Sequence, residues 1–525
     1  MSFKKEATQD SEVDERLAAL TNNSSAIRAI AGAVEGTLGP KGLDTMLVDQ
    51  FGGVVITNDG VTILTLMEAN HPAARMLINI AKAQQEAIGD GTTTATVMAG
   101  TLVGTGVEQV LKGVPVARVL EGLRTGLERA LALMRVQARP VEKLDDPAVR
   151  QVALVAGREH GDIADLVVRA AVLIGKEKLK DDPSFKFSDT VVAEESAENQ
   201  VFMGIIINKE RMNRQMPVEL RQAKILIIDD ALEPEEIDEE ALRTETGFSR
   251  YLQFREEFKE NVHKIAGMGV NLILADRGVD DLADEILTDA GIMVVQRVAG
   301  KELRRAVEHT GARVIRRTGL KKKAAELEKY FGKAERVYHD EKLEQVWILG
   351  GGGKPMATVL VGAATSEVVG ERERIARDAA SSVQAAVRGG VIPGGGSVEL
   401  AIAREVEKVR EGIRGMAAYG VDCVVEALKR PMSQIVANAG FNPLEKMGDV
   451  IASQAKTGKN SLAIDCDNGA VADMYEKGIV DPADVKIYAL KAAGEVAEAI
   501  LRIDTIIKKR EDKGVPAVDA GISGL

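Results

Sequence analysis

The segment GDGTTTATVMAG, residues 89–100, places two glycines and three threonines directly before a helical run. A glycine-rich turn at the start of a helix exposes several backbone N–H groups where the helix dipole is positive, and such a nest binds phosphate oxygens. The threonine hydroxyls would add donors, and Asp90 would offer an oxygen ligand for Mg²⁺. A helix start that is simply capped by Asp90 or Thr92 explains the same letters equally well.

Three further glycine-rich turns flank this segment: TLGPKG (37–42), NDG (58–60) and IPGGGS (392–397). Taken alone, TLGPKG is a helix stop, NDG is a turn of the kind that joins strands, and the three glycines of IPGGGS open a helix as a flexible joint or allow close approach to a ligand. None of these turns fits a known phosphate loop. Another segment, GGGGKP (350–355), has proline where the P-loop needs serine or threonine.

Composition excludes several classes of protein. The 525 residues carry a formal net charge of −12, which disfavours a nucleic-acid partner. No stretch approaches the roughly 18 apolar residues of a membrane helix, and the first residues lack the apolar core of a signal peptide. Cys423 and Cys466 are too few for a disulfide scaffold or a zinc site. These features predict a soluble protein of the cytoplasm without nucleic-acid or membrane partners.

Hydrophobic periodicity divides the chain into helical ends and an α/β centre. Residues 1–143 read as helices, near 27–38, 72–88, 94–111 and onward from Pro115, with a strand pair or hairpin in MLVDQFGGVVITNDGVTIL (46–64). In residues 206–352 helices alternate with short strands, which are expected at 224–229, 270–276, 292–298, 312–315 and 344–350. A strand at 357–361 follows, and helices return from Ser366. This order predicts an α/β unit inserted into a helical domain.

The stretch 231–265 interrupts the α/β pattern. Its first part, ALEPEEIDEE (231–240), is acidic, and residues 247–265 are amphipathic and helical. Two interpretations fit this sequence about equally. One is a solvated loop followed by a surface helix, and the other is a projecting arm that meets neighbouring molecules.

The motifs become specific when they are taken together. LGPKG (38–42), NDGVTIL (58–64), GDGTTTATV (89–97), RDAASSVQAAVRGGVIPGGG (377–396) and GIVDP (478–482) follow one another in this order. The series resembles the chaperonin family over nearly the whole chain, and the segment from Val471 to Arg510 is similar to the thermosome type rather than to the common bacterial type.

The resemblance implies a multidomain fold: a mostly α-helical equatorial domain, a small α/β intermediate domain, and an inserted α/β apical domain with a helical protrusion. The implied boundaries are 1–143 and 392–525 for the equatorial domain, 144–205 and 355–391 for the intermediate domain, and 206–354 for the apical domain, with the protrusion, a built-in lid, at about 231–265.

The resemblance also implies an ATP site with Mg²⁺. Asp90 would hold the metal, Asp378 would position the attacking water with help from Asp59, and Arg158 would sense the γ-phosphate. Thermosome-like chains tend to carry lysine at that position, and arginine changes both reach and geometry. The remaining nucleotide contacts implied are Leu38, Gly39, Pro40, Asn58, Gly60, Gly91, Thr92, Thr93, Thr94, Gly394, Gly395, Asp465 and Asp481. Without the resemblance, neither Asp378 nor Asp59 could be chosen among 80 acidic residues.

The function implied is that of an ATPase subunit of a homo-oligomeric double ring, with eight subunits per ring, that encloses and folds unfolded client proteins without a separate lid co-chaperonin. A ring that only holds clients and hydrolyses little ATP is the alternative, and the presence of Asp59, Asp90 and Asp378 argues against it. A nucleotide-dependent metabolic enzyme would need an acid–base cluster in 206–352, where the sequence offers no compelling one.

Overall fold

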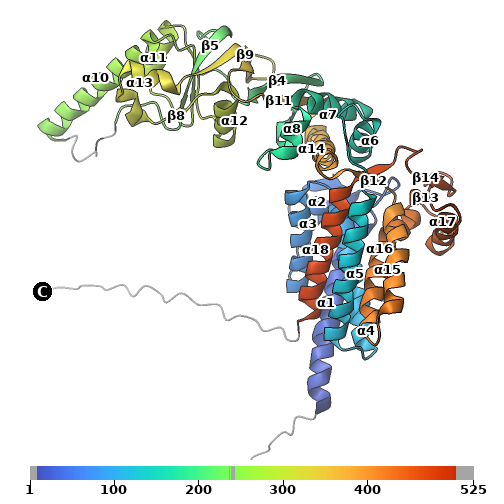
Figure 1. The fold of residues 1–525 in the computed structure, drawn as a ribbon. Helices are drawn as coiled ribbons and strands as arrows, with labels where there is room; N and C mark the ends of the chain where they lie inside the picture. The colour runs from blue at the N-terminus through green and yellow to red at the C-terminus, as the bar shows by residue number, and fades with distance from the viewer. Residues whose placement is uncertain (1–8, 236, 238–242, 504–525) are drawn as a thin grey trace, which may run out of the picture.

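The computed structural model describes residues 9–235, 237 and 243–503, which form three units arranged in an elongated molecule (Figure 1). A helical unit contains both ends of the described chain, a middle unit adjoins it, and a sheet unit lies farthest from it. The chain passes from the helical unit through the middle unit to the sheet unit and then returns by the same route.

The helical unit is built around one aliphatic core that joins residues from both halves of the chain. Its N-terminal part contains α1 (Gln9–Glu35), β1 (Thr45–Val48), β2 (Val54–Thr57), α2 (Gly60–Leu66), α3 (Pro72–Ala87), α4 (Thr92–Leu111) and α5 (Val116–Gln137). Its C-terminal part contains β12 (Val391–Pro393), α15 (Ser397–Gly412), α16 (Ala418–Asn438), α17 (Pro443–Thr457), β13 (Leu462–Ile464), β14 (Val471–Asp473), β15 (Val480–Pro482) and α18 (Ala483–Leu501). Helices α5 and α16 cross with backbone in contact, because a Cβ on Gly122 would lie 1.8 Å from the carbonyl oxygen of Ala417.

The middle and sheet units share one continuous nine-stranded sheet. The middle unit contains α6 (Pro147–Ala156), α7 (Gly161–Ile174), α8 (Lys176–Asp181), β3 (Val191–Glu195), β11 (Ala357–Ala363) and α14 (Ser366–Gly389). The sheet unit contains β4 (Gln200–Ile207), β5 (Glu219–Ile228), β6 (Leu272–Ala275), β7 (Met293–Val295), β8 (Val314–Ile315), β9 (Gly332–Asp340) and β10 (Gln345–Gly351), with helices α10 (Glu245–Gly267), α11 (Asp281–Asp289), α12 (Gly300–Thr310) and α13 (Ala324–Leu327). Strands β5, β6 and β7 are parallel, as alternation of strands and helices predicts.

Two chain segments, one at Arg139 and one at Val391, connect the helical unit to the middle unit, and they are hydrogen bonded to each other. The amide of Arg139 donates to the carbonyl of Val391 at 2.9 Å, and the amide of Val391 donates to the carbonyl of Arg139 at 2.8 Å. Gly390, which has φ +84°, sits against Arg139, and a Cβ there would lie 2.6 Å from that carbonyl oxygen. Strand β12 follows directly and pairs with β15, so this crossing point is continuous with the segment that carries Asp481.

The predicted fold class is confirmed: a helical unit made from both chain ends, with an α/β part inserted. The strands β3, β4 and β9 were not anticipated, and β9 escapes pattern reading because GKAERVYHD is polar. One turn was misjudged, since NDG (58–60) ends β2 and begins α2, whereas such turns were expected to join two strands. Of the predicted arm, positions 236 and 238–242 lie outside the described residues. Among the described helices, none is apolar over a length that would span a bilayer.

Candidate functional site

The first turn of α4 is open to a ligand. Gly91 stands at the N-cap in the left-handed region, with φ 79°, and makes no side-chain cap, so the reading in which Asp90 or Thr92 caps this helix is wrong. The first amides of an α-helix have no partner within the helix, and they carry the positive end of its dipole. A Cβ on Gly91 would lie 2.5 Å from Cγ1 of Val485, so glycine is required here by space as well as by φ. This turn can therefore accept an anionic group.

The NDG turn lies directly against that first turn. A Cβ on Gly60 would lie 2.5 Å from Oγ1 of Thr93 and 3.2 Å from its amide nitrogen, which places the start of α2 beside the start of α4. Asp59 caps α2, because its Oδ2 accepts from the amide of Thr62 at 2.9 Å and from its hydroxyl at 2.6 Å. These bonds fix the Asp59 carboxylate within the site.

Helix α14 of the middle unit packs against the same turn. The hydroxyl of Ser382 donates to Oδ2 of Asp90 at 2.6 Å, while Oδ1 of Asp90 accepts from the amide of Gly91 at 2.6 Å. A Cβ on Gly89 would lie 2.3 Å from Oγ of Ser381. Asp378 stands one helical turn before Ser382 and so shares its face of α14. The carboxylate of Asp378 is half-buried in this junction and is not a solvated surface charge.

The electrostatics of the junction favour a cation. Burial raises the pKa of Asp378 well above its usual range; the neighbouring carboxylates of Asp90 and Asp59 raise it further, and Arg158 and Arg374 oppose them. Burial also raises the pKa of Asp90, with a smaller contribution from Asp481, against the hydrogen bonds from Ser382 and Gly91. Carboxylates that are costly to ionise together are stabilised by a divalent ion or by arginine.

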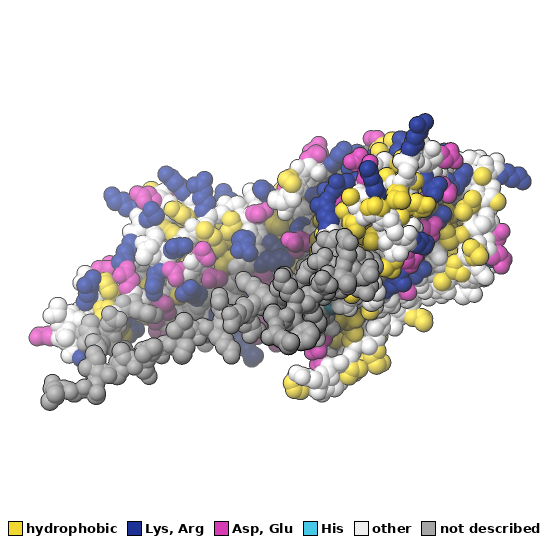
Figure 2. Space-filling view, turned by 90° about the horizontal axis from the view of Figure 1, so that it is seen from below, with side chains coloured by type: hydrophobic (Ala, Val, Ile, Leu, Met, Phe, Trp, Pro, Cys, Tyr) yellow, Lys and Arg dark blue, Asp and Glu magenta, His cyan; other side chains and the backbone are white. Residues whose placement is uncertain are grey.

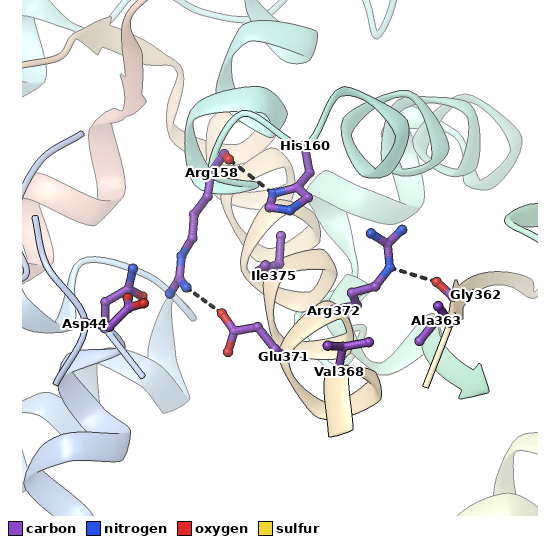
Figure 3. A pocket seen from close by; sticks show the side chains of 11 residues that line it. Asp44, Arg158, His160, Gly362, Ala363, Val368, Glu371, Arg372 and Ile375 are labelled. Carbon is purple, nitrogen blue, oxygen red and sulfur yellow. Dashed lines mark hydrogen bonds and ion pairs between the residues drawn. The ribbon is translucent and has the colours of Figure 1, made fainter. Parts of the chain in front are cut away.

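Arginine side chains border the junction on the side of the middle unit. Arg374, on α14, donates to the hydroxyl of Thr57 and lies 3.9 Å from Oδ2 of Asp59. Arg158, from the loop between α6 and α7, reaches Oε1 of Glu371 at 2.6 Å, as Figure 3 shows. These side chains adjoin a cleft of about 520 Å³ that is lined by both the helical and the middle unit, including Asn58 and Arg158.

A buried lysine lies near Asp90. Nζ of Lys486 lies 2.5 Å from Oε1 of Glu399 and 3.0 Å from Oδ2 of Asp481. Burial alone would lower the pKa of this ammonium, but the charges of Asp481 and Glu399 outweigh it and raise the pKa. Gly394 lies beside the same group, because a Cβ there would be 3.1 Å from Oδ2 of Asp481. Asp481 is thus oriented before any ligand arrives.

The remaining predicted residues surround α16. Gly39, with φ 88°, lies against Ile435, and Asn438 donates to the carbonyl of Leu38 at 2.8 Å. Gly395 lies against Met474 and Ala463, on the hairpin of β13 and β14. The Leu38–Pro40 turn thus packs on α16, and Gly395 packs on the β13–β14 hairpin.

Asp465 is already occupied by protein partners. Its Oδ2 lies 2.8 Å from Nζ of Lys477, and its Oδ1 accepts from the amide of Asp467 at 3.0 Å. Asp467 in turn pairs with Lys41 at 2.7 Å, which ties this hairpin to the Leu38–Pro40 turn. Of the predicted nucleotide contacts, Asp465 therefore has its carboxylate most fully engaged elsewhere.

The structure brings Asp59, Gly60, Asp90, Gly91, Thr92, Thr93 and Asp378 into one junction, with Gly394 and Asp481 close to it through Lys486. Sequence reasoning missed Ser382, Lys486, Glu399, Glu371 and Arg374. Ser382 had a usable signal, because it lies four residues after Asp378 on one helix face. The pair of Lys486 with Glu399 had none, because the two residues are 87 positions apart in sequence.

The donor set fits Mg²⁺ bound together with phosphate oxygens. Within the described residues, no group of three or more metal-ligating side chains forms a site for an ion alone. Asp90 offers two oxygens that each accept only one hydrogen bond, and Mg²⁺ in phosphate sites takes one or two carboxylates with the phosphates and water as other ligands. Asp90 would hold the ion beside the open turn of α4.

Replacement of Lys486 by methionine should destabilise the helical unit by about 3–5 kcal/mol, because it leaves the Glu399 and Asp481 carboxylates without their shared cation. The side chains of Lys486 and Glu399 are only 8% and 0% exposed. Lys491→Met, on the same helix but in an exposed pair with Glu495, is the control and should change stability by less than about 1 kcal/mol. Urea unfolding followed by circular dichroism would measure both, and equal midpoints would contradict the assigned role of Lys486.

Known proteins resemble this chain over most of its length. The family model for the TCP-1/cpn60 chaperonin family matches residues 30–511. The chain is 35% identical to thermosome subunit beta of Archaeoglobus fulgidus, over 92% of this chain and 91% of that one, and 34% identical to thermosome subunit alpha of Thermoplasma acidophilum, over 96% and 93%. A crystal structure of a group III chaperonin in the open state superposes with a TM-score of 0.88 at 47% identity, covering 94% of this chain and all of that one. By sequence and by fold, the chain belongs to the TCP-1/cpn60 chaperonin family.

Proposed function

We propose that this chain is an ATPase subunit of a double-ring chaperonin that encloses and folds unfolded proteins in the cytoplasm. The observation that carries the proposal is the contact between α14 and the turn 89–91, where Ser382 meets Asp90. It makes a site from two units: the anion-binding turn belongs to one and Asp378 to the other. Hydrolysis at such a site is coupled to the angle between the units, which is the coupling that a folding machine needs.

The proposal assigns the helical unit as the equatorial domain (1–143 and 392–525), the middle unit as the intermediate domain (144–205 and 355–391), and the sheet unit as the apical domain (206–354). With these bounds the first part of β4 (Gln200–Ile207) falls in the intermediate domain. The nucleotide would lie with its phosphates on Gly91, Thr92, Thr93 and Thr94 and near Asn58 and Gly60. Its nucleoside would lie between the turns of Leu38, Gly39 and Pro40 and of Gly394 and Gly395, with Asp481 at the ribose. Asp465 is the weakest of these assignments, because Lys477 holds its carboxylate.

Asp90 would hold Mg²⁺, which supplies charge neutralisation to the phosphates when bound. Asp378 would orient the attacking water and accept its proton, and Asp59 would help to orient that water. The half-buried position of Asp378 suits this role, since its raised pKa makes it a stronger base than a solvated aspartate. Arg158 would contact the γ-phosphate when the middle unit approaches.

Asp378→Asn should bind ATP as the parent does and should lose at least about 100-fold in turnover, because the amide keeps the size of the side chain but cannot take the proton. Phosphate release would measure turnover, and a fluorescent ATP analogue would measure binding. Asp422→Asn, on α16 in an ion pair with Arg410 of α15, is the control and should leave both unchanged. Full turnover in Asp378→Asn would disprove the catalytic assignment. A parent chain that binds ATP and protects clients without turnover would favour a ring that only holds clients.

The β1–β2 hairpin supports assembly into rings. Its apolar side chains face solvent; Phe51 is 87% exposed and Ile56 is 57% exposed. Hydrophobic side chains also gather on the helical unit at the right of Figure 2. An exposed apolar hairpin with free strand edges is an aggregation hazard in a monomer, and a neighbouring subunit would remove that hazard.

Ile56→Lys should therefore weaken the subunit contact and shift the chain from rings to smaller species, because a desolvated lysine is costly in an interface. Gln50→Lys adds the same charge at the tip of the hairpin and should leave rings intact. Negative-stain electron microscopy and size-exclusion chromatography would count the subunits per ring, for which we propose eight. Intact rings in Ile56→Lys would show that the hairpin lies outside the interface.

The first half of α10 supports a built-in lid, proposed at about 231–265. Phe258, Val262 and Ile265 in its second half are buried in a sheet-unit cluster, whereas Phe248 and Leu252 in its first half are about half exposed. The tip of α10 projects from the sheet unit in Figure 1. Apolar side chains at a projecting tip fit contacts between the tips of neighbouring subunits, so no separate lid protein is required.

Leu252→Asp should leave ATP turnover intact and abolish the protection of an enclosed client from protease, because a charge at the tip opposes apolar contacts between subunits. The adjacent Gln253→Asp, on a different face of α10, should retain protection. A client that is equally protected in Leu252→Asp and in Gln253→Asp would contradict the lid assignment.

A further inference from the structure

One carboxylate near the site is held by two arginines, and it has no role in the proposed chemistry. Oε1 of Glu371 accepts from Nη1 of Arg158 at 2.6 Å, and Oε2 accepts from Nη2 of Arg374. We refer to these three residues as the Glu371 clamp. Figure 3 shows Arg158 reaching from its loop to Glu371 on α14.

The clamp joins the two cations that face Asp378. Glu371, Arg374 and Asp378 are spaced by three and four residues on α14 and therefore share one face of the helix. Arg158 and Arg374 both oppose the rise in the pKa of Asp378. Arg374 also reaches the helical unit through Thr57, so the clamp lies across the boundary between the two units.

The backbone that carries Arg158 is strained. Arg158 has φ 51° and Glu159 has φ 64°, so two successive non-glycine residues adopt the left-handed region. Such residues cost free energy and persist only where other contacts hold them. The imidazole Nδ1 of His160 lies 3.1 Å from the carbonyl oxygens of Gly157 and Arg158, and the ion pair with Glu371 fixes the far end of the side chain. These contacts thus hold the loop in its left-handed conformation.

We propose that Glu371 restrains ATP binding by holding Arg158 away from the γ-phosphate, so that a triphosphate must compete with this carboxylate for the guanidinium. The inference rests on the proposed function, in which Arg158 contacts that phosphate. The Nη1–H that Arg158 donates to Glu371 at 2.6 Å is committed to that carboxylate, so the guanidinium must turn or release this bond to present the same group to a phosphate. The apparent affinity for a triphosphate is therefore reduced by the fraction of molecules in which Arg158 stays on Glu371.

The restraint is modest because the pair is partly exposed to water. The side chains of Arg158 and Glu371 are 29% and 39% exposed, which places their interaction near the range of surface pairs. A weak restraint can be overcome by a phosphate group, whereas a fully buried pair would block it. ADP has no γ-phosphate and would leave the clamp closed, so the inference separates triphosphate from diphosphate binding.

The test compares the equilibrium binding of a β,γ-imido ATP analogue and of ADP, with Mg²⁺, to the assembled protein. Glu371→Gln should tighten binding of the analogue about two- to fivefold and leave ADP unchanged. Glu373→Gln, which removes a carboxylate from an exposed pair with Arg377 on the same helix, should change neither. Glu371→Asp keeps the charge on a shorter side chain and should give an intermediate value, which guards against a folding defect in Glu371→Gln.

The same substitution in an Arg158→Ala background identifies the path of the effect. Glu371→Gln should then bring no tightening, because Arg158 is the group that Glu371 restrains. Tightening that persists without Arg158, weaker analogue binding in Glu371→Gln, or equal effects on the analogue and ADP would each overturn the inference. If the parent chain binds both nucleotides and Glu371→Gln changes neither affinity, this inference is overturned while the proposed function stands. A parent chain that binds neither nucleotide overturns the proposed function as well.

Discussion

Mutual repulsion among Asp59, Asp90 and Asp378 is the constraint on which the rest of the site depends. These carboxylates come from two units, and burial together with the other two charges raises the pKa of Asp378. Positive groups offset this repulsion. They are the open first turn of α4, Lys486 in its pair with Asp481, and the two arginines of the Glu371 clamp. Each positive group is already paired or oriented, so the site is built before a ligand arrives.

The close approach of backbone explains why glycine marks the site. Gly60 and Gly89 let two separate segments touch the start of α4, and any Cβ there would lie closer than 2.6 Å to a side chain. Besides reversing the chain, the NDG turn contacts the start of α4 and the GDG turn contacts α14. This packing also explains why α14 can dock through residues as small as Ser381 and Ser382.

Sequence periodicity was sufficient for the long helices of the first 143 residues and of the inserted α/β unit, and for most of the inserted strands, because helices such as α3 and α11 carry clear stripes and end shortly before glycines. It gave no prediction for α6, α7 and α8. It failed at β3, β4 and β9, the last of which has too few apolar residues to stand out, and at NDG, whose turn letters do not distinguish a hairpin from a helix cap. Asp378 emerged only through ordered motifs that resemble one family, whereas Asp90 was already a candidate metal ligand from the glycine-rich turn that contains it. The pairs of Lys486 with Glu399 and of Glu371 with Arg158 lay beyond such reasoning, because an ion pair between distant segments leaves no spacing to detect.

The two chain crossings between the helical and middle units have a mechanical consequence. Because Arg139 and Val391 are bonded to each other in both directions, any motion that preserves these bonds must turn both crossings together. Such a pair would act as a single pivot for a rotation of the middle unit. Asp378 would then travel along an arc whose radius is fixed by the length of α14 from Gly389, so its distance from Asp90 would report the rotation angle directly.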